Sequence, residues 1–139
     1  MELSTFTEAH YPELSKFWGQ YGWVAPSIDV LPRKGFVALH EGKIVAAAFC
    51  YLSCSGMALL DWVIGDKDAQ PLTRGKAVYK VIGACQEYAK EQGKSVLYTV
   101  TANQALQETY RKIGFQDMEK GATSMAMSLD GTKLDFIKE

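Results

Sequence analysis

The sequence lacks a long hydrophobic run that could cross a membrane. The nearly uncharged stretch Ile44–Leu60 is interrupted by Ser53, Ser55 and Gly56, so it predicts strands rather than a membrane-spanning helix. The N-terminus MELSTFTEAHYPE carries acidic residues where a secretory signal needs a basic stretch followed by an apolar one. We therefore expect a cytoplasmic protein with no membrane partner.

An excess of one charge is also missing. The formal net charge is -1, and the 15 basic residues are scattered among 16 acidic ones, so the sequence predicts no nucleic-acid partner. The hydrophobic fraction of 47% and the charged fraction of 22% are typical of a globular protein. A length of 139 residues suits one ordinary domain, and no linker or repeat divides the chain. We predict a single domain over residues 1–139.

Cysteine and histidine are scarce. Cys50, Cys54 and Cys85 are odd in number and lack the spacing of a zinc site or a redox pair. Cys50 and Cys85 fall within apolar patterns, where a free thiol behaves as a small hydrophobic side chain. His10 and His40 lie far from any cysteine cluster in the sequence. These residues predict that the protein holds no metal.

The first half of the chain predicts a short strand, a helix and an antiparallel meander. Glu2–Phe6 is the candidate strand, and Pro12 begins a stretch with apolar residues at helical spacing that ends at Gly22. Three further strands follow in quick succession and are joined by two tight turns, which favours antiparallel pairing. They are Gly35–His40, Lys43–Tyr51 and Met57–Ile64.

In the second half of the chain the spacing of the apolar residues changes to that of a helix. From Ala77 to Ala89 apolar residues recur at three- and four-residue steps, which predicts one face of a long helix that ends at Gly93. Val96–Val100 is the next candidate strand, and Gln104–Ile113 is a short helix ended by Gly114. The remaining expectations are a final pair of strands, from Phe115 onward and at Thr123–Leu129, and a charged tail from Asp130 in which Leu134, Phe136 and Ile137 are candidates for docking.

Two local sequences suggest a family. The first is Arg74-Gly75-Lys76 at the start of the long helix, and the second is Asn103 followed by Tyr110-x-x-x-Gly-Phe115. With the order of elements, they resemble the GNAT superfamily of N-acetyltransferases, whose members typically show Arg-Gly-x-Gly-x-Gly, a helix, a strand, an Asn and then Tyr-x-x-x-Gly-Phe. The similarity covers about Met57 to Phe115. It implies an α/β fold with a mixed sheet, in which the antiparallel meander is followed by a β-α-β crossover and a short helix.

The resemblance implies that acetyl-CoA is a cosubstrate. A glycine-rich turn at a helix N-terminus exposes several backbone N–H groups and the positive end of the helix dipole, which suits a pyrophosphate. Here that loop would be Arg74–Tyr79, but Ala77 and Tyr79 occupy the second and third glycine positions, and the Tyr79 ring either crowds the pyrophosphate or points away. The cofactor-binding residues implied by the resemblance are Val63, Ile64, Arg74, Gly75, Lys76, Ala77, Val78, Tyr79 and Asn103.

Tyr110 and Asp61 are the candidate catalytic residues. The resemblance implies that Tyr110 is the general acid, because a phenol with a pKa of about 10 is protonated at neutral pH and can donate to a thiolate. A packed aromatic on the helix face is the alternative for Tyr110. Asp61 is the only acid within the strands predicted between Gly35 and Ile64. It alternates with Leu60 and Trp62, so it faces either the cleft as a general base or solvent.

The resemblance implies an N-acetyltransferase that moves an acetyl group from acetyl-CoA directly to a primary amine. The expected partners are acetyl-CoA and a small amine or a peptide amine, and a homodimer is left open. The aromatic residues Trp18, Tyr21 and Trp23 either line the acceptor pocket or cap the core. Two alternatives remain: a catalytically silent GNAT-like domain that binds acyl-CoA or a protein partner, and a small interaction module without a nucleotide cofactor.

Overall fold

The computed structural model describes residues 1–136 and divides the chain into two compact units. One unit comprises residues 1–98 together with the chain from Asp135, and the other comprises residues 99–134. The elements in chain order are β1 (Glu2–Thr5), the 3-10 helix η1 (Glu8–His10), α1 (Tyr11–Gln20), β2 (Lys34–His40), β3 (Lys43–Leu52), β4 (Met57–Gly65), α2 (Pro71–Glu91), β5 (Val96–Thr99) and α3 (Gln104–Ile113).

The strands form one sheet in the order β1-β2-β3-β4-β5. The first four strands are antiparallel neighbours, as the meander predicts. The start of β5 lies beside the start of β4, because the backbone N–H groups of Ser95 and Val96 both donate to the Gly56 carbonyl, at 2.8 and 3.2 Å. The two strands therefore start side by side and α2 connects them, which is the parallel crossover that the sequence predicts. The predicted mixed α/β fold is confirmed.

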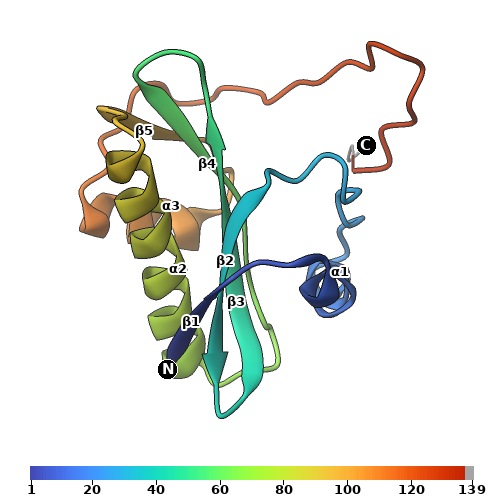
Figure 1. The fold of residues 1–139 in the computed structure, drawn as a ribbon, viewed down its shortest axis with the longest axis vertical. Helices are drawn as coiled ribbons and strands as arrows, with labels where there is room; N and C mark the ends of the chain where they lie inside the picture. Colours follow the sequence, from blue (N-terminus) through green and yellow to red (C-terminus); the bar gives the residue numbers. More distant parts are fainter. Residues whose placement is uncertain (137–139) are drawn as a thin grey trace. The chain divides into compact units, whose positions relative to one another are not determined.

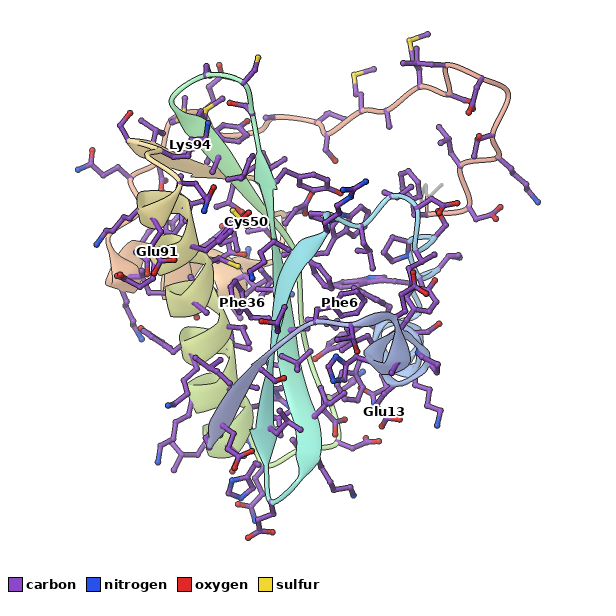
Figure 2. The ribbon with its side chains drawn as sticks, in the orientation of Figure 1. Phe6, Glu13, Phe36, Cys50, Glu91 and Lys94 are labelled. Atoms are coloured by element: carbon purple, nitrogen blue, oxygen red, sulfur yellow. The ribbon has the colours of Figure 1, made fainter. Side chains whose placement is uncertain are left out.

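The sheet is covered by α1 on one face and by α2 on the other (Figure 1). On the α1 face, apolar residues that alternate along β2, β3 and β4 pack against the apolar stripe of α1. Figure 2 shows Phe6 on this side of the sheet and Phe36 on the side of α2. The buried core of the α1 face consists of Phe6, Leu14, Phe17, Trp18, Leu31, Val37, Ala47, Phe49 and Ile64.

The α2 face is built from smaller side chains. Ala46, Ala48 and Cys50 alternate with the α1-face residues of β3, and they let α2 approach the sheet closely. Cys50 and Cys85 are both buried and free, and burial raises the pKa of each thiol. They are therefore small core residues, as the sequence predicts.

The prediction for the chain after Phe115 is wrong. In the described residues 115–134 no strand forms, so the predicted final pair of strands is absent there. The large apolar side chains of this stretch, such as Met125 and Leu129, are exposed, and a strand without a packed neighbour has nothing to stabilise it. Phe136 does pack on the core, with its ring 5.7 Å from that of Trp62. Ile137, the other docking candidate near it, lies outside the described residues.

Within the described residues no helix is both long and apolar enough to span a membrane.

Candidate functional site

The site begins with an irregularity in β4. Ala47 pairs with Ile64 and Phe49 pairs with Asp61, so β4 holds one residue more than β3 between these two pairs. This extra residue makes a β-bulge, and Trp62 has a φ of 55° there. A left-handed backbone is a genuine outlier for a bulky residue. The alternation of side chains along β4 is therefore interrupted at Trp62.

Asp61 occupies the residue before the bulge. As the partner of Phe49, it faces the α1 side of the sheet, and its side chain is half-buried rather than fully in solvent. Its Oδ1 accepts a hydrogen bond from the Trp62 backbone N–H at 2.7 Å. Burial raises the pKa of this carboxyl, and the hydrogen bond from Trp62 opposes that rise. The arrangement favours a carboxyl group that can exchange a proton.

The bulge also turns Trp62 away from the side expected from simple alternation. The sequence places Trp62 on the face of Leu60, yet its indole Nε1 donates to the Tyr51 hydroxyl at 2.7 Å. Tyr51 in turn donates to the carbonyl of Val30 at 2.6 Å. Burial raises the pKa of Tyr51, the bond from Trp62 lowers it, and the charge of Asp61 raises it. Tyr51, Asp61 and Trp62 therefore form one cluster.

Sequence reasoning did not single out Tyr51. The one signal it offered is the alternation of β3, which puts Tyr51 on the same face as Phe49 and so toward the α1 side. Its pairing with Val30 joins the sheet to the irregular stretch between α1 and β2, which no local pattern reveals.

Val63 and Ile64 are predicted to hold the acyl end of the cofactor through their backbone N–H groups, but these two groups point to opposite edges of β4. The Asp66 N–H donates to the Val45 carbonyl at 2.7 Å, and the alternation of an antiparallel ladder then directs the N–H of Ile64 toward β3. The N–H groups of Val63 and Gly65 consequently point to the opposite edge of β4. Since β5 has four residues and starts beside Gly56, it runs past only the first half of β4. Val63 lies beyond that length.

The predicted pyrophosphate loop is a regular helix. α2 begins at Pro71, and the Arg74 N–H already donates to the Gln70 carbonyl at 2.9 Å. The backbone N–H groups from Gly75 to Tyr79 are therefore within the i→i−4 ladder. Proline at the first helical position is pre-organised for a helix and lacks the N–H that would be unpaired there, which explains the earlier start. The N–H groups outside the helical ladder are those of Leu72 and Thr73.

Arg74 is held against the connection between β4 and α2. Its Nη1 donates to the carbonyl of Lys67 at 3.0 Å, with longer contacts to those of Ala69 and Asp66 at 3.4 and 3.5 Å. Gln20 at the end of α1 holds the same connection, since its side chain donates to Asp66 at 2.9 Å and accepts from the Lys67 N–H at 2.8 Å. Arg74 and Gln20 together fix this connection.

The other residues of the predicted loop point in different directions. Ala77 is fully buried in the core, whereas Lys76 and Tyr79 are exposed. Gly75 is exposed, and a Cβ built on it would meet nothing within 4 Å. Glycine in a helix costs about 1 kcal/mol relative to alanine. Neither packing nor a positive φ requires a glycine here, so Gly75 leaves open space beside the first turn of α2.

Asn103 and Tyr110 lie in the unit formed by residues 99–134. Asn103 caps α3, because its Oδ1 accepts from the Leu106 N–H at 3.0 Å. Tyr110 is buried on α3, and its ring lies 5.2 Å from that of Phe115. Both residues therefore have a structural role inside this unit, and their functional roles stay predictions.

No protein-family model matches the chain, and no curated protein matches it significantly. Solved structures do match. They include Rv2747 from Mycobacterium tuberculosis in complex with CoA (TM-score 0.71, 14% identity, 86% of this chain and 74% of that one). They also include the aminoglycoside N-acetyltransferase AAC(6')-Iy in complex with CoA (0.67, 15%, 91% and 100%). A third is the aminoglycoside acetyltransferase meta-AAC0020 from an uncultured soil metagenomic sample, in complex with sisomicin (0.70, 16%, 91% and 95%). This chain has the GNAT fold.

The GNAT fold of this chain offers three kinds of group to an anionic cofactor. They are the outward backbone N–H of Val63, the free N–H groups of Leu72 and Thr73 at the positive end of α2, and the exposed ammonium of Lys76. Among the described residues, no group of three or more His, Cys, Asp or Glu side chains could hold a metal ion.

Proposed function

We propose that this protein is an N-acetyltransferase that transfers an acetyl group from acetyl-CoA directly to a primary amine. The observation that carries the proposal is the bulge of β4, where an outward backbone N–H at Val63 lies two residues after the half-buried Asp61. Three solved structures with this fold support it, since two are complexes with CoA and one is an aminoglycoside acetyltransferase with sisomicin. The acceptor of the present protein is unidentified.

Acetyl-CoA would supply the reactive thioester. On this proposal the Val63 N–H donates to the thioester carbonyl, where negative charge develops as the amine attacks. A pre-organised backbone donor at such a point is worth about 10²–10³ in turnover. Ile64 contributes no donor of its own, because its N–H is directed toward β3, and it supports the site from the core.

The pyrophosphate would lie at the start of α2. The N–H groups of Leu72 and Thr73 and the helix dipole favour a bound anion there, and Lys76 adds a formal charge. The open space beside Gly75 leaves room for close approach. Arg74 retains N–H donors beyond the Nη1 contacts that hold the connection. The backbone N–H groups of Ala77, Val78 and Tyr79 are used by the hydrogen bonds of the helix. These three residues would therefore shape the site without donating a backbone hydrogen bond to the cofactor.

Asp61 is the proposed general base. A primary amine with a pKa of about 10.4 is protonated at neutral pH and must lose a proton before it attacks. The Asp61 carboxylate attracts the ammonium group and can take its proton directly or through water. Burial raises the pKa of Asp61 and thereby makes it a better base than an exposed aspartate.

Tyr110 stays the proposed general acid, and Asn103 a proposed cofactor contact. The phenol would donate its proton to the departing thiolate of CoA. The cytoplasmic location expected from the sequence is part of the same proposal.

One observation favours a second candidate function. Because Arg74–Tyr79 is helical, a cradle of backbone amides is absent from that segment, which would weaken cofactor binding relative to a glycine-rich loop. The alternative is a GNAT-fold protein that binds acyl-CoA or a protein partner without transferring an acyl group.

Two measurements test the proposal in sequence. Acetyl-CoA at 100 times its dissociation constant should stabilise a protein that binds it only when folded by about 2.7 kcal/mol, which a thermal-shift titration detects. Release of free thiol is then measured with a panel of amino acids, polyamines, aminoglycosides and lysine peptides. Binding with turnover supports the enzyme, and binding without turnover supports a silent binder of acyl-CoA. The absence of stabilisation contradicts both of these and leaves only a silent protein that binds a protein partner.

A further inference from the structure

The carboxylate of Asp61 has no cationic partner among the described residues. It is half-buried on the α1 side of the sheet, and its Oδ1 accepts from the Trp62 backbone N–H at 2.7 Å. Within residues 1–136, no lysine, arginine or histidine forms an ion pair with Asp61, and no donor reaches its Oδ2. Burying a carboxylate is costly unless a positive group or further donors approach it. The second oxygen of Asp61 therefore suits one ammonium group from outside the chain.

The side chains around this carboxylate are apolar or aromatic. Leu59 lies two residues before Asp61 on the same face of β4, and its cross-strand partner is Tyr51. The Trp62 indole reaches the Tyr51 hydroxyl, and the Phe136 ring packs edge to face on the Trp62 ring, with the centroids 5.7 Å apart and the planes at 83°. All four side chains are half-buried, so each keeps part of its surface open to a ligand. An amine bound at Asp61 would therefore have an apolar body beside these side chains.

The polar atoms of the two aromatic residues nearest to Asp61 are already used. The Tyr51 hydroxyl gives its one proton to the Val30 carbonyl at 2.6 Å and accepts the proton of the Trp62 Nε1 at 2.7 Å. The other N–H of Trp62, in the backbone, donates to Asp61. Neither residue has a proton left for a hydroxyl or a carboxylate of a ligand. Polar substituents on the acceptor would lose their water here without gaining a partner.

The basic residues of the described chain do not act on this cluster. Neither Asp61 nor Tyr51 has its pKa shifted by a lysine or an arginine. Arg33, directly before β2, is exposed. Asp29 and Asp135 precede two residues that contact the cluster, but both are exposed, so water and salt screen their charge. A carboxylate on the acceptor would therefore find no fixed cation, and a second ammonium would find only screened acids.

We infer that the acceptor is a primary monoamine on an aromatic body without a carboxylate, with its ammonium at Asp61 and its ring against Trp62 and Phe136. The ring of the acceptor extends the edge-to-face pair that these two residues form. Polyamines and aminoglycosides carry several ammonium or hydroxyl groups, most of which would stay unpaired here. The inference rests on the proposed function, since the amine is the group that would be acetylated. It makes Phe136 a specificity-determining residue.

Calorimetry in excess CoA tests the class of amine without turnover. Phenethylamine is compared with three molecules that each change one feature: phenylalanine adds a carboxylate, phenethyl alcohol replaces the ammonium, and ethylamine lacks the ring. Each should bind at least about tenfold more weakly than phenethylamine, and so should the polyamine spermidine. Any molecule of this set that binds as tightly as phenethylamine overturns the inference.

Two variants connect the preference to named side chains. Asp61→Asn should remove the advantage of phenethylamine over phenethyl alcohol, and Phe136→Ala should remove most of its advantage over ethylamine. Phe136 is half-buried near the end of the chain, so Phe136→Ala is expected to fold. Met118→Ala removes an exposed apolar side chain in the unit formed by residues 99–134 and should leave every affinity unchanged. Preferences that stay the same in both Asp61→Asn and Phe136→Ala overturn the inference.

Release of free thiol from acetyl-CoA separates this inference from the proposed function. Phenethylamine joins the panel of acceptors and should have the highest kcat/KM. Turnover that is fastest with spermidine, an aminoglycoside or a lysine peptide overturns the inference and leaves the acetyltransferase in place. Preferential binding of phenethylamine without any turnover contradicts the acetyltransferase and supports the aromatic monoamine as the ligand of this cluster.

Discussion

The end of β4 and the start of α2 are the two regions that would hold acetyl-CoA, and their backbones differ sharply. The end of β4 contains an extra residue and a tryptophan in a left-handed conformation. The start of α2 is a regular helix that begins three residues before Arg74. One region keeps an irregular backbone that directs N–H groups outward, and the other places most of its N–H groups inside a helix. On the proposed function, the acyl end of acetyl-CoA would therefore be held by backbone groups, and its phosphates by side chains and the helix terminus.

The irregular region is costly to maintain. A non-glycine residue in a sparsely populated backbone conformation costs about 1–3 kcal/mol. The hydrogen bonds of Trp62 with Asp61 and Tyr51 offset part of that cost. Strain that is maintained in this way is more typical of a functional site than of a packed core.

The largest expected effect comes from the irregular region. Asp61→Asn should lower turnover on an accepted amine by about 10²–10⁴, because it removes the base. Asn keeps an Oδ1 that can accept from the Trp62 N–H, so acetyl-CoA affinity should be retained. Asp68→Asn changes an exposed acid in the connection to α2 and should turn over at the wild-type rate. Equal rates for Asp61→Asn and wild type would remove Asp61 from the mechanism.

The pH dependence of the free energy of unfolding tests the pKa of Asp61 independently of enzyme activity. Burial raises its pKa, so the folded state favours the protonated carboxyl and this contribution to stability is lost as the pH rises through the raised pKa. Wild type should therefore be less stable than Asp61→Asn at neutral pH, and the difference should vanish in acid. Thermal unfolding of both proteins across that pH range measures it. A difference that grows toward acid would contradict the direction assigned to this pKa.

Tyr110→Phe tests whether Tyr110 donates the proton that the departing CoA thiolate takes up. If Tyr110 protonates the thiolate, turnover should fall by about 10²–10⁴ while acetyl-CoA affinity survives, because the packed ring is kept. If Tyr110 is only structural, turnover should be nearly unchanged, with about 1 kcal/mol of stability lost with the hydroxyl. Steady-state kinetics with released thiol as the readout, beside calorimetry of acetyl-CoA binding, distinguish the two outcomes.

The helical region should show a smaller, graded effect. Lys76→Ala should weaken CoA binding about fivefold to tenfold without a change in the melting temperature, because Lys76 is exposed. Arg74→Ala should weaken binding and also lower the melting temperature, because Arg74 holds the carbonyls of the connection. Lys120→Ala, an exposed lysine in the other unit, serves as the control for loss of charge. Unchanged CoA affinity in both variants would mean that the phosphates bind elsewhere.

Gly75→Ala has the smallest expected effect, and the expected change is a gain in the stability of α2. Alanine should stabilise α2 by about 1 kcal/mol, since no atom lies within 4 Å of its Cβ. If CoA approaches the helix closely at this point, its affinity should fall slightly in the same variant. A gain in stability with no change in affinity would show that Gly75 is not needed for the cofactor.

Much of the fold was predictable because it depends on local patterns. Short apolar runs joined by two tight turns mark the meander, and period-3.6 spacing from Ala77 to Ala89 marks α2. The start of α2 is marked by Pro71, a residue favoured at the first helical position, and not by Arg74-Gly75-Lys76.

The candidate site was less predictable than the fold. The bulge at Trp62 arises from the register between β3 and β4, and the alternation of one strand does not reveal it. The Tyr51 contact with Val30 is tertiary and has no local signature. The predicted strand at Thr123–Leu129 does not form, because a strand also needs a neighbour to pair with.

Titration of acetyl-CoA into isotope-labelled protein, followed through its backbone amide resonances, shows whether the end of β4 and the start of α2 hold the cofactor. Large shifts are expected at Val63, Leu72 and Thr73, whose N–H groups lie outside the ladders of β3 and α2. Smaller shifts are expected from Val78 to Val81, whose amides stay bonded within the helix. If saturating acetyl-CoA leaves Val63 and Leu72 unshifted, or acts only on amides far from β4 and α2, the cofactor does not bind at these two regions.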